Sequence, residues 1–143
     1  DTAPEINSVD QNGEKITLEQ YKGKKLVLYF YPKDMTPGCT AQSCNLTENY
    51  TQLQANGYEV LGVSCDSVKR HQKFIEKYNL AFSLVSDEDQ KVVQDYGVWG
   101  LKKFMGREYM GITRTTFIID ENGVIEDVIA KVDTKNHTEQ ILK

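Results

Sequence analysis

Two of the three cysteines in the chain, Cys39 and Cys44, lie in the segment YFYPKDMTPGCTAQSCNL at residues 29–46. The run Thr36-Pro37-Gly38-Cys39 is typical of a helix start, with Thr36 as N-cap and proline at the first helical position. We expect the Thr36 hydroxyl to accept a hydrogen bond from the Cys39 backbone N–H. The positive end of a helix dipole favours a thiolate over a thiol. The pattern therefore predicts a nucleophilic sulfur at Cys39.

The spacing between Cys39 and Cys44 indicates how the two thiols could react with each other. In an ideal helix, Cα atoms five residues apart are separated by about 8.6 Å, whereas a disulfide requires Cα atoms within about 7 Å. The pair cannot bond within an intact helix, so a disulfide requires local unwinding and fits a transient bond better than a permanent one. If Asn45 is exposed, we expect the helix-stiffening change Asn45→Ala to slow unwinding and to favour overoxidation of Cys39.

Two structural roles for the cysteines are less well supported. A zinc site needs four ligands, commonly in closely spaced pairs, but Cys65, His71 and His137 form no second pair. The Cys-x-x-Cys of a dithiol exchanger is also missing. We therefore expect no metal or other cofactor, interpret Cys65 as a packing thiol, and place both histidines on the surface.

Other side chains near these motifs receive structural interpretations. We interpret Lys33-Asp34 as a solvated loop pair. The apolar residues of the segment 99–110 either wall a pocket or, as we favour, pack against a hairpin; these residues are Trp99, Phe104, Tyr109 and Met110.

The composition favours one globular domain over residues 1–143, because 39% hydrophobic and 27% charged residues are ordinary for such a domain. A net charge of −4 argues against nucleic-acid binding. No apolar run approaches the roughly 20 residues of a membrane span. The start, DTAPEINSVDQNG, lacks the features of a signal peptide, and cysteines are few, so we expect a reducing, cytoplasmic compartment.

Hydrophobic periodicity and turn residues predict an alternating α/β chain. A hairpin around Asn12-Gly13 comes first, and a second around Glu121-Asn122-Gly123 comes late. We expect Asp89 to cap a short helix. The expected strands are 24–32, 58–64 and 82–86; the expected helices are 36–55, 66–79, 89–97 and 134–143. This order predicts a central mixed sheet flanked by helices.

The segment YFYPKDMTPGCTAQSC resembles the active-site segment of the peroxiredoxins, Pro-x₃-Thr-x₂-Cys, and GITRTTFIID resembles the segment that carries their active-site arginine. The Cys-x₄-Cys spacing, YGVWG and GREYMG resemble the bacterioferritin comigratory protein, or peroxiredoxin Q, class. The resemblance runs from about Ala3 to Leu142. It implies a thioredoxin-like fold with an added N-terminal hairpin.

The resemblance also implies a role for each matched residue. Cys39 would be the peroxidatic cysteine and Cys44 the resolving cysteine. Thr36 would bond the sulfur and the peroxide, Pro32 would shield the thiolate from water, and Arg114 would hold thiolate and peroxide together. Cys65 matches no functional position.

The implied reaction is reduction of hydrogen peroxide and alkyl hydroperoxides without metal, haem or flavin. Thioredoxin, or alternatively glutaredoxin, would recycle the disulfide, and we expect a monomer. Two other functions remain possible from the sequence. One is a protein thiol–disulfide oxidoreductase, and the other is a non-enzymatic redox sensor.

Overall fold

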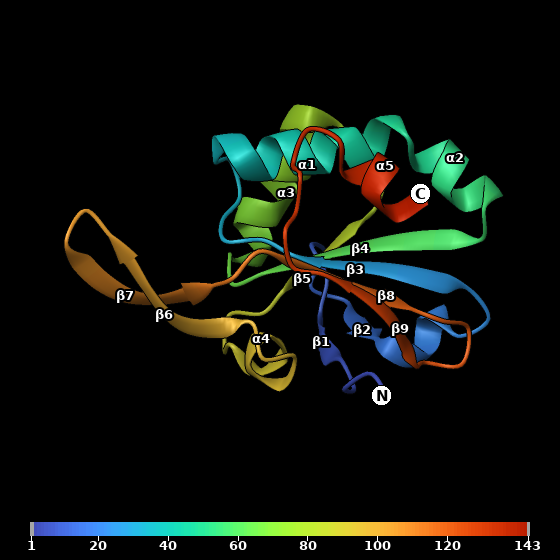
Figure 1. Cartoon of the computed structure of the whole chain (residues 1–143), viewed down its shortest axis with the longest axis horizontal. Coiled ribbons are helices and arrows are strands. Elements are labelled where there is room, and N and C mark those ends of the chain that lie inside the picture. The colour runs from blue at the N-terminus through green and yellow to red at the C-terminus, as the bar shows by residue number, and fades with distance from the viewer. Residues whose placement is uncertain (1, 143) are drawn as a thin grey trace.

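A mixed sheet of seven strands forms the centre of the computed structural model, which describes residues 2–142 and only the backbone of Phe104 (Figure 1). The strand order is β2-β1-β5-β4-β3-β8-β9. The strands are β1 (Asn7–Val9), β2 (Lys15–Thr17), β3 (Lys25–Phe30), β4 (Tyr58–Ser64), β5 (Ser83–Ser86), β8 (Thr115–Ile119) and β9 (Ile125–Ile129). Strands β3, β4 and β5 are parallel, so they all end at the same edge of the sheet. On the other side of β3, β8 runs antiparallel to β3, and β9 runs antiparallel to β8.

Helices cover both faces of this sheet. α1 (Pro37–Glu48), α2 (Tyr50–Ala55), α3 (Val68–Tyr78) and α5 (His137–Leu142) lie on one face, whereas α4 (Lys91–Asp95) lies on the other (Figure 1). The β1–β2 hairpin forms one edge of the sheet. A 3₁₀ turn, η1 (Leu18–Tyr21), follows β2. The predicted mixed sheet, flanking helices and N-terminal hairpin are confirmed. No helix within residues 2–142 is long and apolar enough to cross a bilayer.

The side chains of β3 divide the interior into two cores, because neighbouring residues of a strand point to opposite faces. Leu28 and Phe30 belong to the core beside α4 and the N-terminal hairpin. Tyr29 and Tyr31 belong to the core beneath α1, α2, α3 and α5. Cys39 lies in this second core, so the chemistry predicted for it takes place on the face covered by α1.

The helix predicted over 36–55 is divided at Asn49, whose backbone leaves the helical region at φ −107° and ψ 13°. Two donors of Asn49 share the Asn45 carbonyl oxygen. The side-chain amide donates to it at 2.8 Å, and the backbone N–H donates to it at 3.3 Å. Asparagine competes for helical hydrogen bonds in this way, which disfavours it within helices. α1 is therefore a short helix with its own C-terminus.

The short helix α4 is capped by a different aspartate from the one predicted. Asp87 accepts the backbone N–H groups of Val92 and Val93 at 3.2 and 2.9 Å. Asp89 accepts from the backbone N–H of Lys91 at 3.3 Å. The prediction of Asp89 as the cap was wrong because Asp87, at the end of β5, reaches the amides from outside the helix.

The second predicted hairpin, around Glu121-Asn122-Gly123, is β8–β9. A further hairpin, β6 (Trp99–Phe104) and β7 (Arg107–Ile112), forms its own two-stranded sheet and projects from the body (Figure 1). Its turn places Met105 and Gly106 at positive φ, as in a two-residue hairpin turn. Trp99 is partly buried and packs against the core beside α4. Tyr109 and Met110 are about half exposed, so the prediction that these two side chains pack against the body was wrong. The side chain of Phe104 lies outside the described residues.

Candidate active site

The sulfur of Cys39 lies within the first turn of α1, at the edge where the parallel strands end. Thr36 has extended backbone angles and precedes Pro37 at the first helical position, so the predicted helix start is confirmed. The Thr36 hydroxyl, however, donates to the Lys33 carbonyl oxygen at 2.8 Å and makes no cap bond to the helix. The expected bond from the Cys39 N–H was therefore wrong, because the hydroxyl bonds its own loop.

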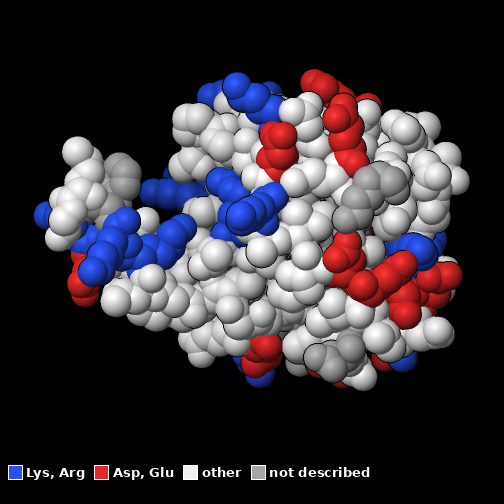
Figure 2. Space-filling view, in the orientation of Figure 1, with Lys and Arg blue, Asp and Glu red and all other residues white. Residues whose placement is uncertain are grey.

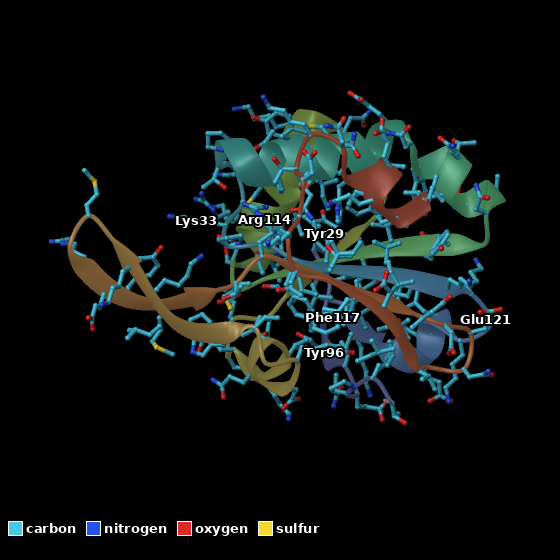
Figure 3. The ribbon with its side chains drawn as sticks, in the orientation of Figure 1. Tyr29, Lys33, Tyr96, Arg114, Phe117 and Glu121 are labelled. Carbon is cyan, nitrogen blue, oxygen red and sulfur yellow. The ribbon has the colours of Figure 1, made fainter. Side chains whose placement is uncertain are left out.

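Arg114 brings a guanidinium to this sulfur from the connection between β7 and β8 (Figure 3). Its Nη2 donates to Cys39 Sγ at 3.3 Å, and its Nη1 donates to Gln42 Oε1 at 2.7 Å. Cys39 itself is fully buried. The fork of the guanidinium fixes its plane through two bonds, which a lysine could not do. The arrangement presents an N–H donor and a positive charge to the sulfur.

Gln42 is a site residue that the sequence reasoning missed. It is fully buried one turn after Cys39, on the same face of α1, and it anchors Arg114. The sequence feature that could have identified Gln42 is its position three residues after Cys39, which places a polar residue on the same face of the helix as the sulfur. Gly38 contributes by its size: a Cβ there would lie 3.1 Å from Arg114 Nη2, so glycine lets the guanidinium approach the helix.

Cys44 lies half-buried near the middle of α1, which is unbroken from Pro37 to Glu48. Both Cys39 and Cys44 are free thiols. Burial, and then the charge of Glu48, raise the pKa of the Cys44 thiol, so this group stays protonated to higher pH than an ordinary cysteine. In this helical state the spacing argument applies, and the two sulfurs cannot bond until α1 unwinds.

Pro32 lies half-buried in the connection between β3 and α1, in the same loop as Thr36. Its shielding of the thiolate stays a prediction.

Cys65 follows β4 and packs against the core on the other face of the sheet from Cys39. Burial, followed by the charges of Asp87 and Asp66, raises the pKa of the Cys65 thiol to about 12. A thiol in this environment is a poor nucleophile at neutral pH. The structure thus separates Cys65 from the cysteine pair.

The surface placement of three polar residues was wrong. His71, His137 and Asp34 are all fully buried. His71 Nδ1 lies 2.6 Å from Asp34 Oδ2, and His137 Nε2 lies 2.8 Å from the Thr116 hydroxyl. Each partner comes from a distant part of the chain, so no local spacing could reveal it. Lys33, by contrast, is exposed as predicted.

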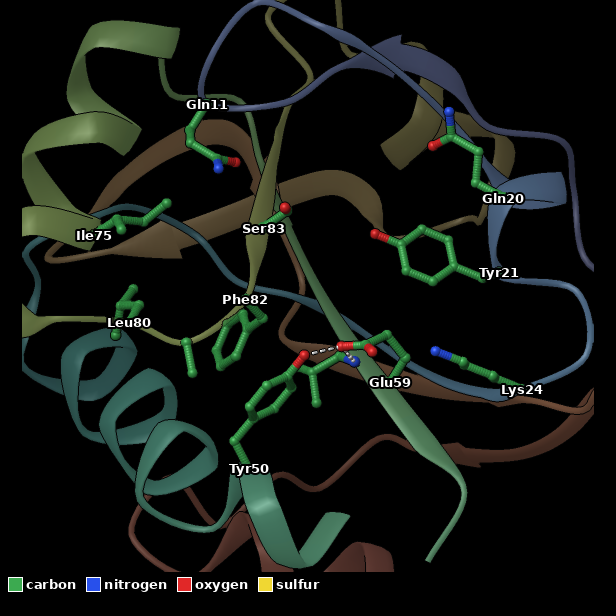
Figure 4. A pocket seen from close by; sticks show the side chains of 12 residues that line it. Gln11, Gln20, Tyr21, Lys24, Tyr50, Glu59, Ile75, Leu80, Phe82 and Ser83 are labelled. Carbon is green, nitrogen blue, oxygen red and sulfur yellow. Dashed lines mark hydrogen bonds between the residues drawn. The ribbon is translucent and has the colours of Figure 1, made fainter. Parts of the chain in front are cut away.

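A polar hollow of about 440 Å³ lies elsewhere, at the beginnings of the parallel strands (Figure 4). Tyr21, Tyr50 and Phe82 line it, and the Tyr50 hydroxyl donates to Glu59. Glu59 lies near the start of β4, whereas Cys39 follows the end of β3. This hollow is therefore separate from the site around Cys39.

Basic side chains gather over the projecting hairpin and the adjoining part of the body, on the face shown in Figure 2. Acidic side chains on that face lie mainly toward the opposite end. Arg114 lies two residues after the end of β7, so the Cys39 site lies near the base of this hairpin.

Comparison with known proteins gives consistent matches. Residues 1–128 match the model of the AhpC/TSA family. The chain is 46% identical over 142 residues to peroxiredoxin Bcp of Escherichia coli K12, covering 99% of this chain and 91% of the relative. It is 44% identical over 141 residues to peroxiredoxin Bcp of Bacillus subtilis 168, covering 99% and 90%.

Solved structures also match over nearly the full chain, at lower sequence identity. A structure of Xanthomonas campestris peroxiredoxin Q aligns with a TM-score of 0.89 at 36% identity, covering 96% of this chain and 87% of that one. Another, with a TM-score of 0.89 at 35% identity and the same coverage, concerns the alkyl peroxide reduction activity of the bacterioferritin comigratory protein of that organism. Peroxidoxin BcpB of Mycobacterium tuberculosis aligns with a TM-score of 0.87 at 30% identity, covering 99% and 92%. These matches confirm the predicted thioredoxin-like fold.

Proposed function

Because the chain belongs to the AhpC/TSA family, within its Bcp and peroxiredoxin Q group, and is a thiol peroxidase, we propose that Cys39 and Cys44 carry its catalytic cycle. The observation that supports this most directly is the 3.3 Å contact between Arg114 Nη2 and Cys39 Sγ at the start of α1. It combines the nucleophile and a cationic donor in one buried site.

In the first step, the Cys39 thiolate attacks one oxygen of the hydroperoxide. The O–O bond breaks, the sulfur is oxidised to a sulfenic acid, and the departing oxygen takes a proton to leave as water or an alcohol. Negative charge develops on that oxygen, so preorganised donors aimed at it contribute most. We assign this role to Arg114 and the backbone N–H groups of the Thr36–Cys39 turn, with Thr36 orienting the peroxide and Pro32 excluding water.

In the second step, the Cys44 sulfur attacks the sulfenic sulfur of Cys39, and water leaves as the disulfide forms. This step requires unwinding of α1, because the helical spacing keeps the two residues too far apart. A second peroxide molecule competes for the sulfenic acid and would oxidise it to the sulfinic acid. The rate of unwinding therefore sets the resistance of the enzyme to peroxide.

A dithiol protein, thioredoxin or alternatively glutaredoxin, then reduces the disulfide. Organic hydroperoxides are included among the substrates because of the activity described for the Xanthomonas relative. We further propose a monomer in the cytoplasm, where a transient disulfide can be reduced again.

The test is a disulfide map after one equivalent of hydrogen peroxide. Cleavage after Glu48 separates Cys65 from the other two cysteines, whereas trypsin leaves all three in one peptide because no Lys or Arg lies between Lys33 and Lys69. We expect a Cys39–Cys44 bond with Cys65 free, and loss of peroxide consumption in Cys39→Ser. A Cys39–Cys65 bond would overturn the assignment of Cys44, and undiminished activity in Cys39→Ser would overturn the assigned site.

Two assays on the same protein test the two alternative functions. Repeated turnover with thioredoxin excludes a role as a stoichiometric sensor alone. Rapid reduction of insulin would instead indicate a protein thiol–disulfide oxidoreductase.

A further inference from the structure

A buried polar network holds the loop between β3 and α1, and the reaction chemistry described above does not use it. Asp34 in this loop and His71 on α3 are both fully buried and lie 2.6 Å apart. The Tyr31 hydroxyl, also buried, donates to the other oxygen of Asp34 at 2.5 Å. Burying such groups is costly unless they are fully hydrogen-bonded. Their presence beside the Cys39 loop therefore calls for a functional reason.

The positions of the protons follow from the partners. His71 Nε2 lies 2.9 Å from the Val85 carbonyl oxygen, which can only accept, so Nε2 carries a hydrogen. A single proton then lies between His71 Nδ1 and Asp34. Burial raises the pKa of Tyr31 well above its ordinary value, so its hydroxyl remains a donor to Asp34. Both nitrogens of His71, both carboxylate oxygens of Asp34 and the Tyr31 hydroxyl thus each have a hydrogen-bond partner.

The backbone of Asp34 is held as firmly as its side chain. Its N–H donates to Asp66 Oδ2 at 2.8 Å, and its carbonyl oxygen accepts from Arg70 Nη2 at 3.0 Å. Asp66 also accepts from the Ser64 hydroxyl at 2.7 Å and pairs with Arg70 Nε at 3.1 Å. Residue 34 is thus fixed by Tyr31 just after β3, by Asp66 just after β4, and by Arg70 and His71 on α3.

The carboxylates of Asp34 and Asp66 and the imidazole of His71 lie close enough together to suggest a metal site. Their hydrogen bonds argue otherwise. Asp66 already accepts from two donors and faces a guanidinium, and His71 uses both ring nitrogens. A cation would have to displace these bonds, so the arrangement fits a hydrogen-bonded clamp.

The residue that follows this clamp is strained. Met35 has a φ of 68°, a left-handed conformation that a residue other than glycine adopts at a cost. Such a conformation persists only where the surroundings over-determine it. The next residue, Thr36, is the N-cap of α1, and Gly38 in the first turn lies against Arg114. The position of the first turn of α1 therefore depends on how Asp34 is held.

We propose that Tyr31, Asp34 and His71 are positioning residues for peroxide reduction. They hold Met35 in its left-handed conformation and so keep the first turn of α1 in place against Arg114. This inference rests on the proposed function, because its readout is the reaction of Cys39 with peroxide.

The test compares two reactions of Cys39 in a chain where Cys44 and Cys65 are serine, so that Cys39 alone reports. Peroxide reduction depends on the orientation of the peroxide as well as on the thiolate, whereas alkylation by iodoacetamide depends on the thiolate and its exposure. We expect His71→Leu to lower the rate constant for hydrogen peroxide by about tenfold to a hundredfold, with a much smaller change in alkylation. His71→Asn, which can still donate to Asp34, should recover part of the loss.

Two further variants separate positioning from stability. Tyr31→Phe removes one hydroxyl and should give a smaller decrease of the same kind, so it carries the test if His71→Leu does not fold. Val92→Ala weakens the core beside α4 without touching the network and should react with peroxide at the parental rate. Parental peroxide rates in the His71 and Tyr31 variants, or equal losses in both reactions, would overturn the proposal. The proposed function fails separately, if Cys39→Ser still consumes peroxide.

Discussion

The side chain of Asn45 ties α1 to α5, and this contact reverses the effect expected from the sequence for Asn45→Ala. Asn45 is half-buried and makes three hydrogen bonds across the two segments. Its Nδ2 donates to the Lys135 carbonyl oxygen at 2.9 Å, and its Oδ1 accepts from the backbone N–H and the hydroxyl of Thr138, each at 2.8 Å. Unwinding of α1 around Cys44 has to break this contact.

The size of the effect follows from the number of bonds. Three hydrogen bonds contribute roughly 1.5–4.5 kcal/mol, taking about 0.5–1.5 kcal/mol for each. Alanine gains at most about 0.7 kcal/mol from its higher helix propensity. Asn45→Ala should therefore favour the unwound form by about 1–4 kcal/mol. Even the lower limit changes the equilibrium by about fivefold, since about 1.4 kcal/mol is a factor of ten.

We expect Asn45→Ala to form the Cys39–Cys44 disulfide faster and to resist overoxidation better than the parent. The assay treats reduced protein with graded hydrogen peroxide during turnover with thioredoxin. The fraction of Cys39 sulfinic acid is then measured by mass spectrometry after cleavage at Glu48. Greater overoxidation of Asn45→Ala would refute this reasoning, because it would mean that the gain in helix propensity outweighs the lost hydrogen bonds. No change would show that unwinding leaves the contact with α5 intact.

The matched control is Asn56→Ala. Asn56 lies at the exposed end of α2, where its side chain donates to the Gln52 carbonyl oxygen at 2.8 Å. The substitution is chemically the same but does not affect the contact between α1 and α5. Its overoxidation should equal that of the parent.

Three further predictions concern single residues. Arg114→Lys loses the two-point attachment of the guanidinium, so stopped-flow measurements should show peroxide reduction slowed by about 10²–10³-fold, as for other lost transition-state donors. Burial lowers the pKa of His137 below 6.5, so the unfolded chain binds a proton at this residue more readily than the folded chain does. The urea concentration at the midpoint of unfolding should therefore fall as the pH decreases below 6.5. His137→Asn should reduce this pH dependence. Because the pKa of Cys65 is raised to about 12, Cys65→Ser should keep parental peroxidase activity, and Cys65 should be alkylated slowly at pH 7.

The helices and strands that have a clear local sequence pattern could be predicted from the sequence. Tyr29 and its neighbours in β3 form a continuous apolar run, and Asn12-Gly13 is a strong turn signal, so both elements were found. β6 and β7 were missed because Gly100 and Gly111 interrupt the apolar alternation at their bases. A projecting hairpin also lacks a buried face that would give it a clear pattern.

Within the site, the sequence could identify the reacting groups but not the groups that hold them. Cys39 and Arg114 were matched to motifs, and the structure brings them into contact. Gln42 bonds Arg114, and Asp34 bonds His71, and each pair is far apart in the sequence. In a sequence, a lone buried histidine looks no different from one at the surface. Sequence spacing carries no information about such long-range hydrogen bonds.

The way α1 is attached suits the proposed cycle, in which the helix unwinds and forms again in each turnover. Among its residues only Cys39 and Leu46 are buried apolar side chains, and its other attachments are polar. Ser43 bonds the Tyr29 hydroxyl at 2.8 Å, Gln42 bonds Arg114, and Asn45 bonds Thr138. Water can replace such bonds when the helix opens, so each costs less to break than the equivalent buried apolar surface. Ser43→Leu, which adds apolar surface at a buried position of α1 that does not bond Arg114, should therefore slow unwinding and raise the fraction of overoxidised Cys39.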